Sequence, residues 1–231
     1  MGGAIVRGDG YLRHSIWEHS ETLARLYRAR ARDEAEEMTC AAQAAELLAP
    51  FASAGDSLLD AGCGSGYFFH SLRRRDLKLD YWGIDASPRL VGIGRDELAR
   101  FGLAPERLQA MRIEDFRGEA DHVLCMNVLS NIDNYHRPLA RLLEAARKTL
   151  VLRESAKPGA HYAWVRDEHL DPGVELSVHV NAYDIADLTG FIEDHGFTVE
   201  RITDRRSGGA AEDVIGHPHW WTFFRAVRKN V

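Results

Sequence analysis

The sequence predicts an α/β fold in which seven strands form a mixed sheet, mostly parallel with the last strand antiparallel, flanked by helices. Short apolar runs alternate with amphipathic helical segments between residues 57 and 154, and such alternation implies parallel strands with helices on both faces. A glycine-rich stretch closes the first strand, and two apolar runs, 197–202 and 220–227, end the chain as a strand pair. We therefore expect a cleft at the carboxyl ends of the strands.

Composition limits the partners of the chain. Its 231 residues are 45% hydrophobic, which suffices for one well-buried domain with additions. The net charge of -6 and the pI of about 6.0 predict neither nucleic-acid nor membrane binding. The three cysteines are far apart and suggest reduced thiols. Without a signal-peptide core or a long apolar run, we expect a cytoplasmic monomer or homodimer.

The N-terminal region, residues 1–50, is predicted to be a helical cap or lid on the domain formed by 51–231. Apolar residues recur at helical spacing from about 14 to 30, and a second helix is expected from about 33 to 48. Tyr11 and Trp17 are candidates for the wall of a pocket beneath this cap. Packing of Trp17 as an ordinary core residue is the alternative.

The stretch from Ser57 to Gly66 organises the rest of the chain. Two leucines end a buried strand, and Asp60 is then followed by glycines at positions 62, 64 and 66. Glycine permits a sharp turn and a close approach of the backbone, and the helix expected from 67 to 75 offers unpaired N–H groups to a polar ligand. A tight turn without a ligand is the alternative.

The following elements keep the alternation. A strand over 77–84 ends in Asp85, which lies 19 residues after Gly66, and a helix runs from 88 to 101. An acidic residue at this position in α/β folds accepts hydrogen bonds from ribose hydroxyls, although Asp85 could instead cap the next helix. Strands over 108–113, 121–132 and 148–154 follow, and 155–182 is expected to be a long functional loop.

These motifs resemble those of class I S-adenosylmethionine-dependent methyltransferases, which have a Rossmann-like fold. The resemblance covers 55–230 in element order, with specific motifs at 58–66, 81–85, 113–116 and 121–132. It implies S-adenosyl-L-methionine as cofactor, S-adenosyl-L-homocysteine as product, and a donor site formed by Asp60, Ala61, Gly62, Cys63, Gly64, Gly66, Asp85, Ala86, Ile113, Glu114, Asp115 and Asn127. Arg112 stands where many relatives have an acid, so Glu114 or Asp115 would contact the adenine.

The methyl acceptor is expected to be a small molecule whose hydroxyl or amine attacks the methyl group in line, aided by a histidine base. An imidazole titrates near neutral pH, and His136 and His179 are the first candidates among eleven histidines. The predicted acceptor-binding residues are Tyr11, Trp17, Asn131, His161, Tyr162 and His217. His217 could equally belong to a structural turn, and Asn127 could simply cap a strand end.

No metal is predicted, because the acidic residues near 133 and 167 do not form a recognisable ligand set. Two other functions remain possible on this sheet. One is a different nucleotide-cofactor enzyme, since fold does not determine function. The other is a non-catalytic S-adenosylmethionine-binding partner or regulatory protein.

Overall fold

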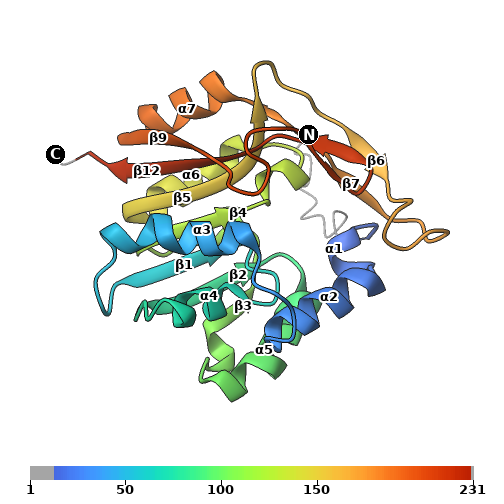
Figure 1. Ribbon diagram of the computed structural model, residues 1–231, viewed down its shortest axis with the longest axis horizontal. Helices are drawn as coiled ribbons and strands as arrows, with labels where there is room; N and C mark the ends of the chain where they lie inside the picture. The colour runs from blue at the N-terminus through green and yellow to red at the C-terminus, as the bar shows by residue number, and fades with distance from the viewer. Residues whose placement is uncertain (1–12, 230–231) are drawn as a thin grey trace, which may run out of the picture.

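One main sheet forms the centre of the protein in the computed structural model, which describes residues 13–229 (Figure 1). Seven strands follow one another in the order β3-β2-β1-β4-β5-β12-β9. Their bounds are β1 (Ser57–Ala61), β2 (Asp80–Asp85), β3 (Leu108–Ala110), β4 (Ala120–Met126), β5 (Ala146–Lys157), β9 (Phe197–Thr203) and β12 (Trp221–Arg228). β12 is antiparallel to β5 and β9, whereas the pairs from β3 to β5 are parallel. The predicted fold class is confirmed, with the short β8 (Tyr183–Asp184) adding an eighth strand beside the end of β5.

Helices cover both faces of the sheet. One apolar cluster joins one face to α3 (Thr39–Leu48), α4 (Phe68–Arg74) and α5 (Pro88–Leu98). A second cluster joins the other face to α6 (His136–Ala145) and α7 (Ile185–Asp194). Residues on both sides of the predicted boundary at residue 50 share the first cluster. Short 3₁₀ helices occupy Ala49–Phe51, Ala99–Phe101, Pro105–Arg107, Ile113–Asp115 and Leu129–Asn131.

The N-terminal helices are shorter than the sequence predicts. Ser20 divides the expected helix into α1 (Ile16–His19) and α2 (Glu21–Ala31), because its hydroxyl accepts the Leu23 N–H at 3.1 Å and caps α2. The predicted second helix begins only at Thr39. Asp33, with φ of 60°, has left-handed backbone that cannot continue a helix.

The cap packs against the segment expected to be a long loop. This segment contains a hairpin of β6 (Trp164–Arg166) and β7 (Ser177–His179). A second hairpin, β10 (Glu212–Val214) with β11 (His217–His219), precedes β12. A third apolar cluster contains Ile16 and Leu23 of the cap, Ile215, and buried residues of the 163–180 segment. Figure 1 shows α1, α2, β6 and β7 at one end of the sheet.

Within residues 13–229, none of the helices combines the length and the apolar character needed to cross a membrane.

Candidate active site

The glycine loop lies between the ends of β1 and β2. The N–H groups of Gly62 and Cys63 both donate to the Ile84 carbonyl, at 2.8 and 3.0 Å. Gly62, Gly64 and Gly66 have φ values of 78°, 57° and 71°, a backbone region that strongly favours glycine. The loop is therefore held in a fixed left-handed path at the carboxyl edge of the sheet.

Close neighbours give these glycines a second reason to lack a side chain. A Cβ at Gly62 would lie 2.1 Å from Val128 Cγ2, and a Cβ at Gly64 would lie 2.2 Å from Tyr27 Cε1. Val128 follows β4 and Tyr27 belongs to α2. The loop thus meets the neighbouring strand end on one side and the cap on the other. The sequence alone does not reveal either partner.

Asp85 holds the loop to the beginning of α5. Its Oδ2 accepts the Gly64 N–H and its Oδ1 accepts the Ser87 N–H, both at 2.8 Å. Burial raises the pKa of this carboxyl, and these two N–H donors oppose the rise. A carboxylate has about four acceptor positions, so each oxygen keeps capacity for a ligand hydroxyl. The N-cap of α5 is Ser87 and not Asp85, the alternative role considered for that residue.

Asp60 faces the protein interior. Its Oδ2 accepts the Tyr81 hydroxyl at 2.7 Å, and burial raises the pKa of the carboxyl to about 7, with the nearby charge of Asp85 adding to the rise. Cys63 is also buried. In this arrangement Asp60 supports the base of the loop through Tyr81.

The expected adenine segment, Ile113–Asp115, forms a 3₁₀ helix beside the end of β2. The Met111 N–H donates to the Asp85 carbonyl at 2.8 Å, which places the segment next to the ribose candidate. Ile113 is buried, whereas the Glu114 carboxylate forms an ion pair with Arg112 at 2.9 Å. Asp115 is exposed. Arg112, which stands where many relatives have an acid, is therefore paired with one of the two acids expected to contact the adenine.

The turn after β4 is fixed by Glu154, a buried residue of β5. Oε1 accepts the N–H groups of Val128 and Leu129, both at 2.9 Å. Oε2 accepts the N–H and the hydroxyl of Ser130, at 2.8 and 2.7 Å. Burial raises the pKa of Glu154, and these donors lower it in part. Glu154 was not among the residues predicted from the sequence. The adjacent charges of Arg153 and Glu154 at the end of an apolar strand could have indicated it.

Asn127 immediately follows β4 and is held in left-handed backbone with φ of 59°. Its N–H donates to the Arg153 carbonyl at 2.7 Å, and its carbonyl accepts the Asn131 side-chain amide at 2.6 Å. The Asn127 side chain accepts a hydrogen bond from the Arg153 guanidinium. Asn127 and Asn131, both predicted site residues, are thus brought together.

The two candidate bases belong to different elements. His136, at the start of α6, is exposed, stacks on Tyr135 at 4.0 Å and bonds Asn134 Oδ1 at 2.7 Å. His179, on β7, has its ring 4.4 Å from that of Trp164. Burial lowers the pKa of His179 and Asp133 partly opposes this. Their roles as bases stay predictions.

Most predicted acceptor residues belong to the N-terminal cap or to the segments that connect β5 with β12. Trp17, on α1, is half-buried and packs against two of the apolar clusters. Tyr162 is 55% exposed, and His161 is joined to Ala182 by a β-bridge. His217 begins β11. Tyr11 lies outside the described residues.

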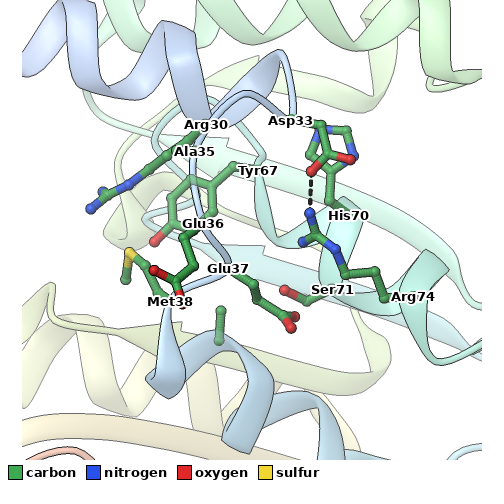
Figure 2. Close-up of a pocket in the computed structure, with 11 residues that line it drawn as sticks. Arg30, Asp33, Ala35, Glu36, Glu37, Met38, Tyr67, His70, Ser71 and Arg74 are labelled. Atoms are coloured by element: carbon green, nitrogen blue, oxygen red, sulfur yellow. Dashed lines mark hydrogen bonds and ion pairs between the residues drawn. The ribbon is translucent and has the colours of Figure 1, made fainter.

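A small pocket lies between the link from α2 to α3 and the first turns of α4 (Figure 2). Arg30 and Tyr67 line it, and an ion pair joins Asp33 to Arg74 at its other side. The Arg30 guanidinium lies 5.2 Å from the ring of Tyr67, which directly follows the glycine loop, and 5.3 Å from that of Tyr27. The pocket thus places a cation beside the loop. Within residues 13–229, no group of three or more histidine, cysteine or acidic side chains is arranged to hold a metal ion.

Comparison with known proteins identifies the class of this site. A family model described as "methyltransferase domain" matches residues 27–202. The chain therefore belongs to the methyltransferase-domain family. It is a class I enzyme that depends on S-adenosylmethionine. A search of curated proteins finds no match.

Solved structures of methyltransferases share the fold at low sequence identity. An S-adenosylmethionine-dependent methyltransferase from Clostridium acetobutylicum ATCC 824 is 12% identical, with a TM-score of 0.62, covering 90% of this chain and 98% of that one. Magnesium protoporphyrin IX methyltransferase from Synechocystis PCC 6803, with bound S-adenosylmethionine, is 19% identical, with a TM-score of 0.56, covering 81% and 76%. A glycopeptide N-methyltransferase complexed with S-adenosylmethionine is 14% identical, with a TM-score of 0.57, covering 82% and 94%.

Proposed function

We propose that this enzyme transfers the methyl group of S-adenosylmethionine to a hydroxyl or amine of a small-molecule acceptor. One observation carries the proposal: the glycine loop and Asp85 are joined by a hydrogen bond of 2.8 Å at the carboxyl edge of the sheet. The cap and the 163–180 segment pack together beside this edge, which favours an enclosed acceptor over a large polymer. The net charge of -6 favours the same class. We also propose a cytoplasmic monomer or homodimer.

The donor site proposed from the sequence fits the residues present. The glycines hold the loop in a tight turn whose Gly64 N–H bonds Asp85, and Asp85 has acceptor capacity for ribose hydroxyls. Ile113 supplies an apolar surface and Glu114 or Asp115 an acid for the adenine. We assign the remaining positions of the loop and its flanks, together with Ala86 and Asn127, to the same site.

When bound, S-adenosylmethionine supplies an electrophilic methyl group on its sulfonium. The contribution of the chain is then to hold the acceptor atom in line and to remove its proton where necessary. His179 suits proton removal, since its lowered pKa keeps the imidazole neutral at neutral pH. His136 is the second candidate. Two structural neighbours are named as methyltransferases of magnesium protoporphyrin IX and of a glycopeptide, which supports a small-molecule acceptor here.

Calorimetry with S-adenosylmethionine and S-adenosylhomocysteine tests the donor site. We expect Asp85→Asn to weaken the binding of both ligands at least tenfold. An amide has only one accepting oxygen, so it cannot replace both carboxylate oxygens as acceptors for the ribose hydroxyls and the backbone N–H groups. Asp96→Asn, at an exposed position of α5, is the matched control and should bind normally. Absence of binding to the wild-type protein at millimolar ligand would refute the proposed function.

Turnover separates catalysis from a purely binding role. Formation of S-adenosylhomocysteine is measured on fractionated small-molecule extracts, and then on the acceptor that they contain. We expect His179→Ala to lower the maximal rate without changing donor affinity, with His136→Ala compared beside it. Full activity in both variants would remove these two residues as bases, and donor binding without turnover on any fraction would favour the regulatory alternative.

A further inference from the structure

Helix α1 lies against the start of α5, close to the residue proposed to bind the ribose. The Ser87 N–H donates to Asp85 Oδ1 at 2.8 Å. The Ser87 hydroxyl donates to Glu18 Oε2 of α1 at 2.6 Å, and the Trp17 carbonyl lies 3.2 Å from the same hydroxyl. Ser87 thus joins the candidate ribose-binding residue to the cap.

Glu18 holds α1 on α5 through its charge. Its Oε2 also accepts the Arg89 N–H at 3.3 Å, one of the first N–H groups of α5, which have no acceptor within the helix. A negative charge is favoured at this end of a helix. The Arg89 guanidinium in turn donates to the Glu18 carbonyl at 3.4 Å and pairs with Glu21 at 2.7 Å. The polar contact between α1 and α5 is therefore centred on Glu18.

This contact is opposed by a repulsion. Burial raises the pKa of Asp85, and the charge of Glu18 adds to the rise, so the two carboxylates are close enough to repel each other. Glu18 is only half-buried, and the side chain of Glu21 is 67% exposed. Water can therefore replace these hydrogen bonds at a small cost, and the contact is of a kind that can open and close.

The joint between α1 and α2 allows α1 to move while α2 stays in place. Ser20, which lies between them, has an extended backbone with φ of -72° and ψ of 122°, and this interrupts the helix. The far end of α2 is fixed to α5, because Arg28 pairs with Glu97 at 3.0 Å and the Glu97 side chain is only 10% exposed. Helix α1 is tied instead to the 163–180 segment by the apolar cluster around Ile16, so we expect these two to move together.

We propose that α1 is a lid on the donor site and that Glu18 is the latch that holds this lid on α5. The proposal rests on the function proposed above, and it adds that the lid is closed both before and after the donor binds. The donor then enters and leaves only while Glu18 is released from Ser87 and Arg89, so this contact limits both rates. Because the latch stabilises the closed lid equally in both states, weakening it accelerates entry and exit by the same factor and leaves the affinity unchanged.

Surface plasmon resonance on the immobilised protein, with S-adenosylhomocysteine as the probe, measures both rate constants. We expect Glu18→Ala to raise the association and dissociation rate constants by about tenfold each, because the closed lid loses hydrogen bonds to a charged group. The dissociation constant should stay close to that of the wild type. Ile16→Ala, which loosens the same helix on its apolar side, should also raise both rate constants. Glu34→Ala, at an exposed position after α2, is the matched control and should bind at wild-type rates.

The same measurements can overturn the inference. Unchanged rate constants in Glu18→Ala, whether or not Ile16→Ala accelerates binding, would show that Glu18 is not a latch. Faster dissociation alone, with weaker affinity, would mean that Glu18 contacts the donor directly. If the wild-type protein does not bind S-adenosylhomocysteine, the proposed function fails and the lid fails with it, and this outcome is recognised before any variant is measured.

Discussion

At the scale of single residues, burial sets the properties of the site more than sequence type does. Asp60 and Asp85 are carboxyls of the same kind, yet Asp85 accepts two backbone N–H groups whereas Asp60 accepts one tyrosine hydroxyl. N–H donors stabilise the charged form, and burial disfavours it. The pKa of Asp60 therefore rises to about 7, so its charge changes near neutral pH.

Asp60 predicts a pH dependence of stability. Because its pKa is higher in the folded protein than in the unfolded chain, its contribution is fully present below pH about 4 and is lost as the pH rises through about 7. Asn at this position stays neutral. We expect the free energy of unfolding of Asp60→Asn, relative to the wild type, to rise between pH 5 and pH 8 by up to about 1.4 kcal/mol per pH unit. Urea denaturation at the two pH values measures this, and an unchanged difference would contradict it.

The glycine loop and Asp85, which we propose as the donor site, form a pattern that can be read from the sequence, but the partners of these residues cannot be read from it. The glycine spacing and Asp85 form a local pattern, and local patterns can be read from a chain. The contacts of Tyr27 with Gly64 and of Val128 with Gly62 join segments far apart in sequence, and no periodicity encodes them. The same holds for Arg153 of β5 and Asp204, just after β9, whose ion pair depends on β12 bringing these two strands to its two sides.

At the scale of elements, the turn after β4 depends on a single side chain of the next strand. The carboxylate of Glu154 accepts three consecutive backbone N–H groups, as it would at a helix N-terminus. The 3₁₀ helix Leu129–Asn131 is too short to satisfy them by itself. The position of Val128 against the glycine loop consequently depends on Glu154.

Replacing this carboxylate should destabilise the turn. In Glu154→Gln the amide NH₂ must face either Ser130 or the Val128–Leu129 pair, which leaves at least one buried N–H without an acceptor. We expect a loss of about 1–3 kcal/mol in the free energy of unfolding, measured by urea denaturation. Glu144→Gln on α6, whose partner is Arg141 and whose side chain is 57% exposed, should change stability by less than about 0.5 kcal/mol. Equal stability of the two variants would show that the turn does not need the carboxylate.

Elements with strong periodicity were predicted well, and those defined by caps or by tertiary pairing were not. The amphipathic spacing of α6 and the apolar run of β4 are intrinsic to their sequences. Ser20 divides the first helix because its hydroxyl bonds Leu23 N–H and also Asp171, a partner about 150 residues away. The strands β6 and β7 are each three residues long, too short to be distinguished from loop by alternation.

At the scale of the whole molecule, the cap, the 163–180 segment and the β10–β11 hairpin pack against one another beside the carboxyl edge of the sheet. Ser15 and Ser177 form a parallel bridge, and the Ser177 N–H donates to the His14 carbonyl at 2.7 Å. A Cβ at Gly216, between β10 and β11, would lie 2.0 Å from His169 Nε2. The cap, the 163–180 segment and the β10–β11 hairpin therefore share contacts and are expected to open together.

Ile16 tests this cooperation, because it is fully buried in the apolar cluster that joins the three segments. Ile16→Ala removes that contact at a cost of about 2–4 kcal/mol. We expect backbone amides of the cap, of 163–180 and of the β10–β11 hairpin to exchange faster with deuterium, while those of β4 and β5 keep their protection, since the two large clusters beside the sheet are untouched. Leu26→Ala, at a 39% exposed position of α2, should leave the exchange pattern near that of the wild type. Faster exchange confined to the cap would show that the 163–180 segment and the β10–β11 hairpin keep their positions without the cap. The three segments would then not open as one cooperative unit.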